Sequence, residues 1–316
     1  MSAYPLFSAG FARGYAVTCR PYLCFVSGVT GLAGLAATKS LSTTGAVVLG
    51  VVFFLAYAFG QALTDVTQID TDRLSAPYRP LVRGEIRARD VLVVSFFGLS
   101  LCALALVLFD RRAAIGAAVA VAGLASYTPL KRRYWAGPIH NSWIVATLPV
   151  LAALADGRSV RALVLDPDLL ALIGTAFFGY MTFVLLGYLK DVEADRKARY
   201  ETIAVRFGRR ATVAVSFVAA LAAISAAAHV IVRAGSNIAH AVFVVAAAML
   251  LGGHVRAWRI VRDSAAWPAI VMGLRGYVAL QVAVTIALAP KLLLVGALSL
   301  VAFEIALARR PCQEQV

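Results

Sequence analysis

The chain has 316 residues, of which 61% are hydrophobic and only 15% are charged, well under the charged fraction of about 25% that is usual in globular proteins. This composition and a mean hydropathy of +0.82 exclude a soluble protein. The net charge of +14 lies in short loops between apolar runs, which favours lipid headgroups or an anionic substrate over nucleic acid. Barrel strands alternate in polarity, and these runs do not. We therefore predict one all-α, polytopic membrane domain covering residues 1–316.

Ten apolar runs follow one another along the chain. They cover about residues 16–38, 43–64, 90–109, 113–128, 139–155, 168–189, 211–232, 237–255, 268–289 and 291–308. Most are long enough to span a bilayer as a helix, so nine or ten spans are expected. Whether 291–308 spans the membrane, re-enters it or lies at its surface is left open. Glu304 lies inside this last run, and the sequence names no partner for it.

The loops between the runs differ in basic charge. Those after even-numbered runs hold about eighteen Lys and Arg residues and those after odd-numbered runs about seven, so the positive-inside rule places the even-numbered loops in the cytoplasm. We expect an integral membrane protein, in a bacterial cell membrane, whose loops after the second, fourth and sixth runs share the cytoplasmic face.

The second run leads into a first acidic segment, near residues 61–86, that carries Asp65, Asp70 and Asp72 before a basic loop. In a continuous helix Asp65 and Asp72 lie within about 20° of one face with Gln68 between them, whereas Asp70 points away. Carboxylates on one face at a membrane edge are costly unless a cation or a solvated cavity holds them. This pattern predicts a metal site at the end of the second run.

The sixth run leads into a second acidic segment, near residues 187–208, in which Asp191 and Asp195 are four positions apart. On a helix this spacing puts the two side chains one turn apart, with Cβ atoms roughly 5–6 Å from each other. Mg²⁺ takes one or two carboxylates and completes its octahedron with water and phosphate oxygens. Two facing acidic segments therefore predict a magnesium site for a diphosphate with an apolar tail.

These segments resemble the UbiA superfamily of intramembrane prenyltransferases. Its first signature is usually N-D/Q-x-x-D-x-x-x-D followed by P-x-R-P-L. The run Pro77-Tyr78-Arg79-Pro80-Leu81 aligns Asp72 with the last acid of that signature and Asp65 with its second position. Thr64 stands where Asn is usual, and Gln68 stands where the middle Asp is usual.

Two further elements complete the resemblance. Asp191 and Asp195 match the second signature, D-x-x-x-D, and Tyr127 to Lys131 is similar to a Tyr-x-x-x-Lys element at the end of the fourth helix. The three elements occur in the family's order, within about residues 15–290. The resemblance implies about nine spanning helices and cleavage of an allylic prenyl diphosphate with Mg²⁺, followed by transfer to an acceptor that is most often an electron-rich aromatic ring.

The resemblance, together with the chemistry of diphosphate cleavage with Mg²⁺, indicates candidate site residues. The metal ligands are expected to be Asp65, Asp72, Asp191 and Asp195. Catalytic roles beside the metal are expected for Tyr127 and Lys131. Substrate contacts are expected from Thr64, Gln68, Arg79, Arg132, Lys190, Tyr188, Asn141 and Arg20.

Two alternatives stay open at this point. A terpene cyclase of the same superfamily would let the prenyl chain's own double bond attack the cation. Gln68 replaces a carboxylate of the first signature, which should weaken magnesium binding there, and the resemblance implies that family members with cyclase activity have such an eroded first signature. A transporter would place its acids in mid-membrane or at broken helices. The aspartates here lie at the ends of apolar runs, which counts against transport.

Overall fold

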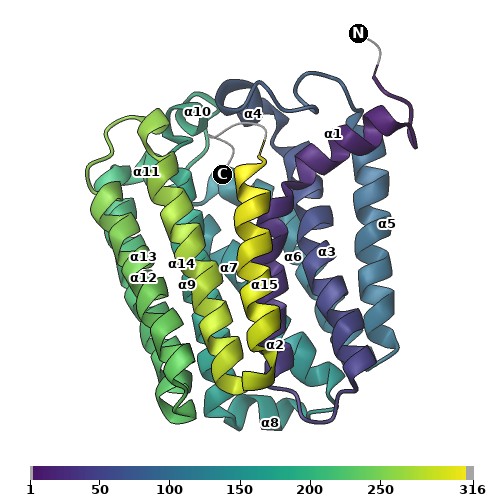
Figure 1. Cartoon of the computed structure of the whole chain (residues 1–316). Helices are drawn as coiled ribbons and strands as arrows, with labels where there is room; N and C mark the ends of the chain where they lie inside the picture. The colour runs from purple at the N-terminus through teal and green to yellow at the C-terminus, as the bar shows by residue number, and fades with distance from the viewer. Residues whose placement is uncertain (1–2, 311–316) are drawn as a thin grey trace.

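The computed structural model describes residues 3–310, and within that range all regular elements are helices. Long helices stand side by side in one bundle (Figure 1). The helices in chain order are α1 (Ala9–Cys19), α2 (Cys24–Ala36), α3 (Thr43–Thr67), α4 (Ile69–Ser75), α5 (Ala88–Val107), α6 (Arg111–Arg133), α7 (Gly137–Ala155), α8 (Val160–Leu165), α9 (Pro167–Tyr188), α10 (Val192–Lys197), α11 (Ile203–Arg206), α12 (Gly208–Ala234), α13 (Asn237–Ala257), α14 (Trp267–Leu288) and α15 (Leu293–Ala308). Short 3₁₀ turns are η1 (Pro21–Leu23), η2 (Asp263–Ala265) and η3 (Pro290–Leu292).

Within the described residues, nine helices are long and apolar enough to cross a membrane, which confirms the predicted polytopic bundle. They are α3, α5, α6, α7, α9, α12, α13, α14 with η2, and α15 with η3. The last run, whose form the sequence left open, is thus a helix of spanning length. It packs against α14 and α2 and runs along the bundle (Figure 1).

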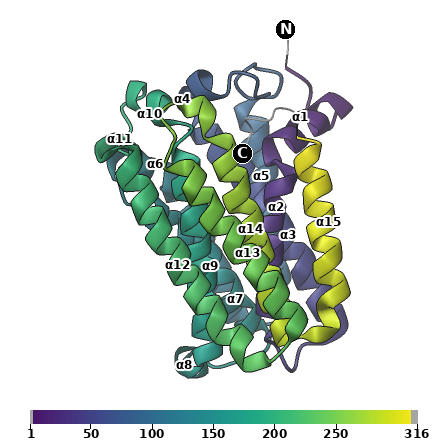
Figure 2. The same cartoon turned by 60° about the vertical axis from the view of Figure 1, so that its left-hand side comes forward.

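The first apolar run is broken at Arg20 and does not form the single helix predicted over about residues 16–38. Arg20 adopts a left-handed backbone conformation, with φ 50°. Pro21 follows it, and a residue before proline is disfavoured in the right-handed helical region. As a result α1 lies across the end of the bundle while α2 runs along it (Figures 1 and 2).

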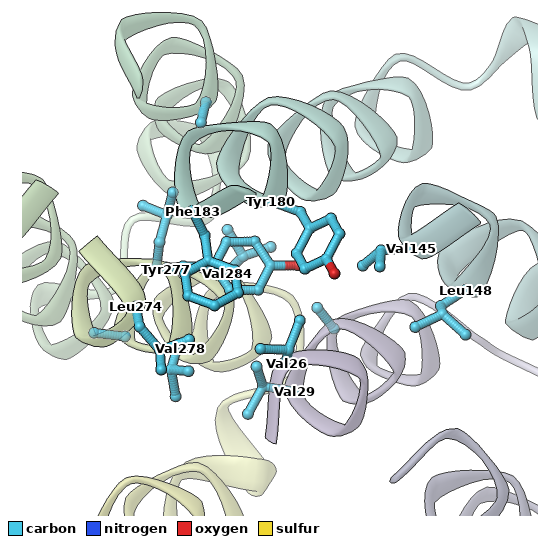
Figure 3. Close-up of a cluster of buried hydrophobic side chains, with 14 of the residues drawn as sticks. Val26, Val29, Val145, Leu148, Tyr180, Phe183, Leu274, Tyr277, Val278 and Val284 are labelled. Carbon is cyan, nitrogen blue, oxygen red and sulfur yellow. The ribbon is translucent and has the colours of Figure 1, made fainter. Parts of the chain in front are cut away.

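The interior is densest around α14, which packs against α2, α9, α12, α13 and α15. At Gly276 a Cβ atom would lie 2.9 Å from the backbone nitrogen of Leu250 and 3.1 Å from the carbonyl oxygen of Ala246. Glycine is therefore needed for α13 and α14 to approach each other this closely, as small residues allow in membrane bundles. Buried side chains of α2, α7, α9 and α14 meet beside this contact, with the rings of Tyr180 and Tyr277 6.3 Å apart (Figure 3).

The two acidic segments lie at one end of the bundle. The short helices α4 and α10 stand at that end together with α1 and α11, whereas α8 lies at the opposite end (Figures 1 and 2). The C-terminal end of α6, which carries Lys131, meets them there. The three signature elements therefore share one end, as expected. That this end faces the cytoplasm stays a prediction.

Glu304 has a partner that the sequence did not reveal. Arg275 of α14 donates to it twice, from Nε to Oε1 at 2.7 Å and from Nη2 to Oε2 at 2.6 Å. Both side chains are partly exposed on the outside of the bundle. This ion pair joins α15 to α14.

We expect Glu304→Leu to lower stability by about 2 kcal/mol, because it leaves the Arg275 charge unpaired in an apolar span. Thermal unfolding in lipid nanodiscs measures the effect. The double variant Arg275→Leu/Glu304→Leu should regain most of the loss, since neither charge remains. A double variant as unstable as the single one would show that the ion pair is not the cause.

Candidate functional site

A cavity of about 240 Å³ lies between α2, α3, α5, α6, α7 and α9, many times the roughly 10–15 Å³ that holds one water. Its polar head, at the end of the acidic segments, is lined by Arg20, Gln61, Thr64, Asp65, Gln68, Asp72, Arg79, Tyr127, Lys131, Tyr188, Lys190 and Asp191. Its apolar body is lined by residues such as Val52, Leu99, Leu106, Ala117, Ala120, Val121, Leu124, Leu148, Leu151 and Phe183. The cavity wall is thus charged at one end and apolar along the rest.

The first acidic segment is not one continuous helix, which was the condition for placing Asp65 and Asp72 on one helix face. α3 ends at Thr67, Gln68 leaves helical geometry with φ −117° and ψ 14°, and α4 begins at Ile69. Asp65 and Asp72 nevertheless both line the cavity. The break lies between them, so the i, i+7 argument does not by itself account for their shared direction.

Two arginines neutralise these first acids. Arg20 Nη2 donates to both carboxylate oxygens of Asp65, at 2.8 Å each, and Gln61 Nε2 donates to Oδ1 at 2.7 Å. Arg79 forms an ion pair with Asp72 and lies 3.7 Å from Asp65. Burial works to lower the pKa of Arg79, but the neighbouring carboxylates Asp72 and Asp65 outweigh it and raise the pKa.

Asp191 stands at the start of the second acidic segment, as the N-terminal cap residue of α10, and lines the cavity. Lys190 Nζ lies 3.7 Å from its Oδ2. Burial works to raise the pKa of Asp191, but the charges of Lys190 and Lys131 outweigh it and hold the pKa below its usual value. Burial lowers the pKa of Lys190 in turn, against the attraction of Asp191. A second cavity of about 270 Å³ shares Lys190 and Asp191 on its own wall.

Asp195 does not line the cavity, although it was expected to face the same way as Asp191. It is completely buried, and Lys131 Nζ lies 3.5 Å from its Oδ1. Burial raises the pKa of Asp195 to about 6, and the charge of Lys131 limits that rise. Because Asp191 sits outside α10, the one-face geometry of an i, i+4 pair does not apply. Asp195 instead stands behind Lys131 as its buried charge partner.

Lys131 is held by aromatic rings as well as by charge. Its Nζ lies 5.2 Å from the ring centroids of both Tyr188 and Tyr200, within the range of cation–π attraction. It also donates to Gln68 Oε1 at 3.4 Å. The Tyr127 and Tyr188 hydroxyls are 2.9 Å apart, so they form a hydrogen bond that fixes both rings at the cavity wall.

Of the nominated residues, most gather at the cavity, and two do not. Arg132 points to the outside, where it donates to Asp70 Oδ1 at 2.9 Å and to the Thr67 carbonyl at 3.0 Å. Arg132 therefore does not line the cavity, and Asp195 is the other exception. Asn141 does line the cavity, with its Nδ2 3.4 Å from the Tyr180 hydroxyl.

Three residues that sequence reasoning did not nominate also belong to this site or support it. Gln61 binds Asp65, and Tyr57 lines the cavity and contacts the Tyr180 hydroxyl at 3.3 Å. Both lie on the same face of α3 as Asp65, at intervals of four residues, so helical periodicity could have found them. Tyr200 packs on Lys131 from a loop, and no spacing signal marks it.

A charged head above an apolar, membrane-embedded cavity defines a class of site that takes an anionic group with a hydrocarbon tail. Residues 24–276 match the UbiA prenyltransferase family. Digeranylgeranylglyceryl phosphate synthase from Methanoregula boonei is 27% identical over 218 residues, covering 68% of this chain and 76% of that protein. A solved UbiA homologue from Aeropyrum pernix K1 has a TM-score of 0.71 at 17% identity, covering 83% of this chain and 96% of that chain. Another from Archaeoglobus fulgidus, bound to DMAPP and Mg²⁺, has a TM-score of 0.61 at 19% identity, covering 86% and 98%.

The chain therefore belongs to the UbiA prenyltransferase family, which confirms the resemblance drawn from the signatures. The helical bundle of the solved homologues is also the fold of this chain. It is an intramembrane enzyme of the prenyltransferase class.

The polar head suits a hard divalent cation. Asp65, Asp72 and Asp191 present carboxylate oxygens, which Mg²⁺ prefers. Within residues 3–310, no three His, Cys, Asp or Glu side chains gather into one metal-binding group. Asp191 is the most loosely paired of the three acids, with its lysine 3.7 Å away.

Proposed function

We propose that this chain cleaves a prenyl diphosphate at the polar head of the cavity, with Mg²⁺, and transfers the prenyl group to an acceptor inside the membrane. The observation that carries the proposal is the placement of four cationic side chains, Arg20, Arg79, Lys131 and Lys190, at the mouth of one apolar cavity. The Archaeoglobus fulgidus homologue bound to DMAPP and Mg²⁺ supports both the substrate class and the metal.

Each group at the head has a defined task in this proposal. Asp65, Asp72 and Asp191 would hold magnesium, which when bound offsets the negative charge that develops on the diphosphate as the C–O bond breaks. Lys131 and Lys190, which line the same polar head, would bind the phosphate oxygens. Asp195 acts through Lys131 as a positioning residue and is no longer assigned as a metal ligand.

The departing prenyl group leaves as an allyl cation, and the cavity wall below the head is aromatic. Tyr127 and Tyr188 are fixed there by their shared hydrogen bond, with Tyr180 and Tyr57 deeper. Ring faces of this kind attract a cation, while the apolar body keeps water from capturing it. The tyrosines therefore stabilise the cation until an acceptor reaches it.

Two classes of acceptor are consistent with this cavity. The signatures favoured an aromatic ring, whereas the named relatives point to an acceptor bearing a glyceryl phosphate. Cyclisation without an acceptor is the second candidate, supported by Gln68. This residue brings an amide to the signature's middle position and contacts Lys131 and Thr128 there.

One assay separates these outcomes. Purified protein in nanodiscs is incubated with Mg²⁺ and a prenyl diphosphate, alone, with a phenolic acceptor, or with a prenylated glyceryl phosphate. We expect diphosphate release and product formation only when an acceptor is present. A cyclised hydrocarbon or alcohol in the acceptor-free sample would replace transfer by cyclisation. No diphosphate release under any condition would refute the proposed function.

A further inference from the structure

We propose that the second cavity, which adjoins the polar head, is the exit site for the inorganic diphosphate that the reaction releases, with Lys197 as the cation at its outer end. This inference rests on the proposed function, because it takes the diphosphate to be left behind at the polar head. It gives the second cavity a ligand and a task.

Inorganic diphosphate needs a way out that differs from that of the prenyl group. Once the C–O bond is broken, the anion carries no hydrocarbon. It lies between the apolar body of the cavity and the end of the bundle that carries α4 and α10 (Figures 1 and 2). An ion is costly to move through apolar surroundings. The diphosphate therefore has to leave past the end of the bundle and not through the cavity body.

Most of the charged wall of the polar head is closed. Its most buried charged side chains are each at most 9% exposed, namely Arg20, Asp65, Asp72, Arg79 and Lys131. The side chains of Lys190 and Asp191 keep more exposure, 16% and 20%. The polar head is thus most open beside these two residues.

Lys190 and Asp191 also form part of the wall of the second cavity, which measures about 270 Å³. The rest of this wall comes from the end of α4, from α10 and from η2 with the start of α14. These residues are Leu74, Ser75, Glu193, Ala194, Lys197, Asp263, Ser264 and Trp267. Inorganic diphosphate has seven oxygen atoms, and at one water's share of about 30 Å³ for each it fills at most about 210 Å³. The second cavity is therefore large enough to hold it.

The second cavity leads from the polar head to the surface. Its inner residues, Lys190 and Asp191, are largely buried. At its outer rim the Glu193 side chain is 56% exposed, and Lys197 and Ser264 are exposed as well. This rise in exposure gives the cavity a direction, inward to the site of cleavage and outward to the surface.

The free charge at the outer end of the second cavity is positive. Asp263 forms an ion pair with Arg209 and accepts a hydrogen bond from the Glu193 backbone nitrogen at 2.9 Å. Glu193 forms an ion pair with Arg196 at 2.9 Å. Lys197, by contrast, forms no ion pair within residues 3–310. Arginines thus compensate the acids at the rim, and Lys197 is left to attract an anion from the polar head.

Lys190 connects the two sites because it lines both cavities. At the polar head the diphosphate is paired with Lys131 and Lys190, and in the second cavity it is paired with Lys190 and Lys197. The anion therefore keeps a cation beside it along the whole path. This avoids the cost of a buried charge without a partner.

The first test narrows the second cavity. Ser264→Trp adds an indole to its exposed rim, and the matched control Ala265→Trp adds the same bulk at the next residue, which is exposed and lines neither cavity. Labelled inorganic diphosphate is bound with Mg²⁺ to the protein in nanodiscs and is chased with an excess of unlabelled diphosphate. We expect Ser264→Trp to slow release at least about tenfold while the affinity stays within about threefold of the wild type, because an obstructed passage slows binding and release alike. Ala265→Trp should release diphosphate at the wild-type rate. Unchanged release in Ser264→Trp, or equal slowing in both variants, would overturn the inference.

The second test removes charge from the same cavity. Lys197→Gln should lower the association rate of inorganic diphosphate at least about threefold at low salt, and the difference should shrink as salt is added, because an exposed cation attracts an anion through a screened field. The matched control is Lys39→Gln, at the opposite end of the bundle, where the Lys39 backbone nitrogen donates to Asp156 at the end of α7. Association should stay at the wild-type rate in this control. An equal loss in both variants, or no loss in Lys197→Gln, would remove Lys197 from the exit site.

Turnover separates this inference from the proposed function. With a prenyl diphosphate and an acceptor, Ser264→Trp should keep the single-turnover rate within about threefold and then show a slower steady state, since only release is obstructed. A slower single turnover would show that the substrate itself enters through the second cavity, which would overturn its role as an exit. If the wild type binds inorganic diphosphate but never turns over, the proposed function fails while the chase still decides the inference. If turnover proceeds and Ser264→Trp does not slow the chase, the inference fails while the proposed function stands.

Discussion

Asp191→Asn should reduce prenyl diphosphate turnover at least about 10³-fold while leaving the protein folded in detergent. The asparagine keeps the size of the side chain but removes the carboxylate that is most loosely paired at the polar head. The loss falls on the bond-breaking step, because a metal held less firmly offsets less of the charge on the departing diphosphate. Diphosphate release under saturating substrate measures the effect, and gel filtration with a thermal melt verifies folding.

The matched control for this change is Glu193→Gln. Glu193 lies two residues away, is exposed, and pairs with Arg196 at 2.9 Å. Since an exposed ion pair contributes little, turnover should stay within about threefold of the wild type. Wild-type rates in Asp191→Asn would remove Asp191 from the metal site. Equal losses in both variants would indicate a general effect of charge at this end of the bundle.

Lys131→Met should lower turnover by about 10²-fold or more, through loss of a fixed cation beside the departing diphosphate. It should also lower stability, because Asp195 then stays completely buried without the cation that lies 3.5 Å from it. Adding Asp195→Asn to Lys131→Met removes that unpaired charge. The double variant should therefore recover the melting temperature but not the activity.

The neighbouring residue supplies the control for the lysine. Arg132→Met removes a cation one position along the same helix, but this side chain points outward to Asp70 and not into the cavity. Its turnover should remain within about threefold of the wild type. If Arg132→Met were as inactive as Lys131→Met, the placement of Arg132 outside the site would be wrong. Recovery of activity in the Lys131→Met/Asp195→Asn variant would reduce Lys131 to a structural role.

The membrane-spanning helices could be predicted from the sequence, because the length of an apolar run directly indicates whether it can span a bilayer. It missed the break at Arg20, where a residue before proline turns left-handed and directs its guanidinium to Asp65. Counting apolar residues along the chain does not reveal a helix interruption of this kind. The turn matters for the site because it brings a cation from the first run to an acid of the second.

Spacing was a weaker guide within the site than across the fold. The i, i+4 rule assumes a continuous helix, but Asp191 lies just outside α10 and Asp195 lies within it. Which way Lys131 and Arg132 point depends on the packing of α6 against distant segments, and adjacent basic residues look alike in a sequence. Tyr200 reaches Lys131 from a loop, so it has no periodicity to detect.

The charges at the polar head of the cavity and directly behind it are evenly matched. Four cations stand against four acids, Arg20, Arg79, Lys131 and Lys190 against Asp65, Asp72, Asp191 and Asp195. Between turnovers the enzyme therefore rests in the bilayer without an unbalanced field that would draw counter-ions into it. A bare pyrophosphate would upset this neutrality, whereas one that arrives already paired with its divalent counter-ion nearly preserves it. We therefore expect the prenyl diphosphate to enter the cavity as its complex with the divalent cation and not as the free anion.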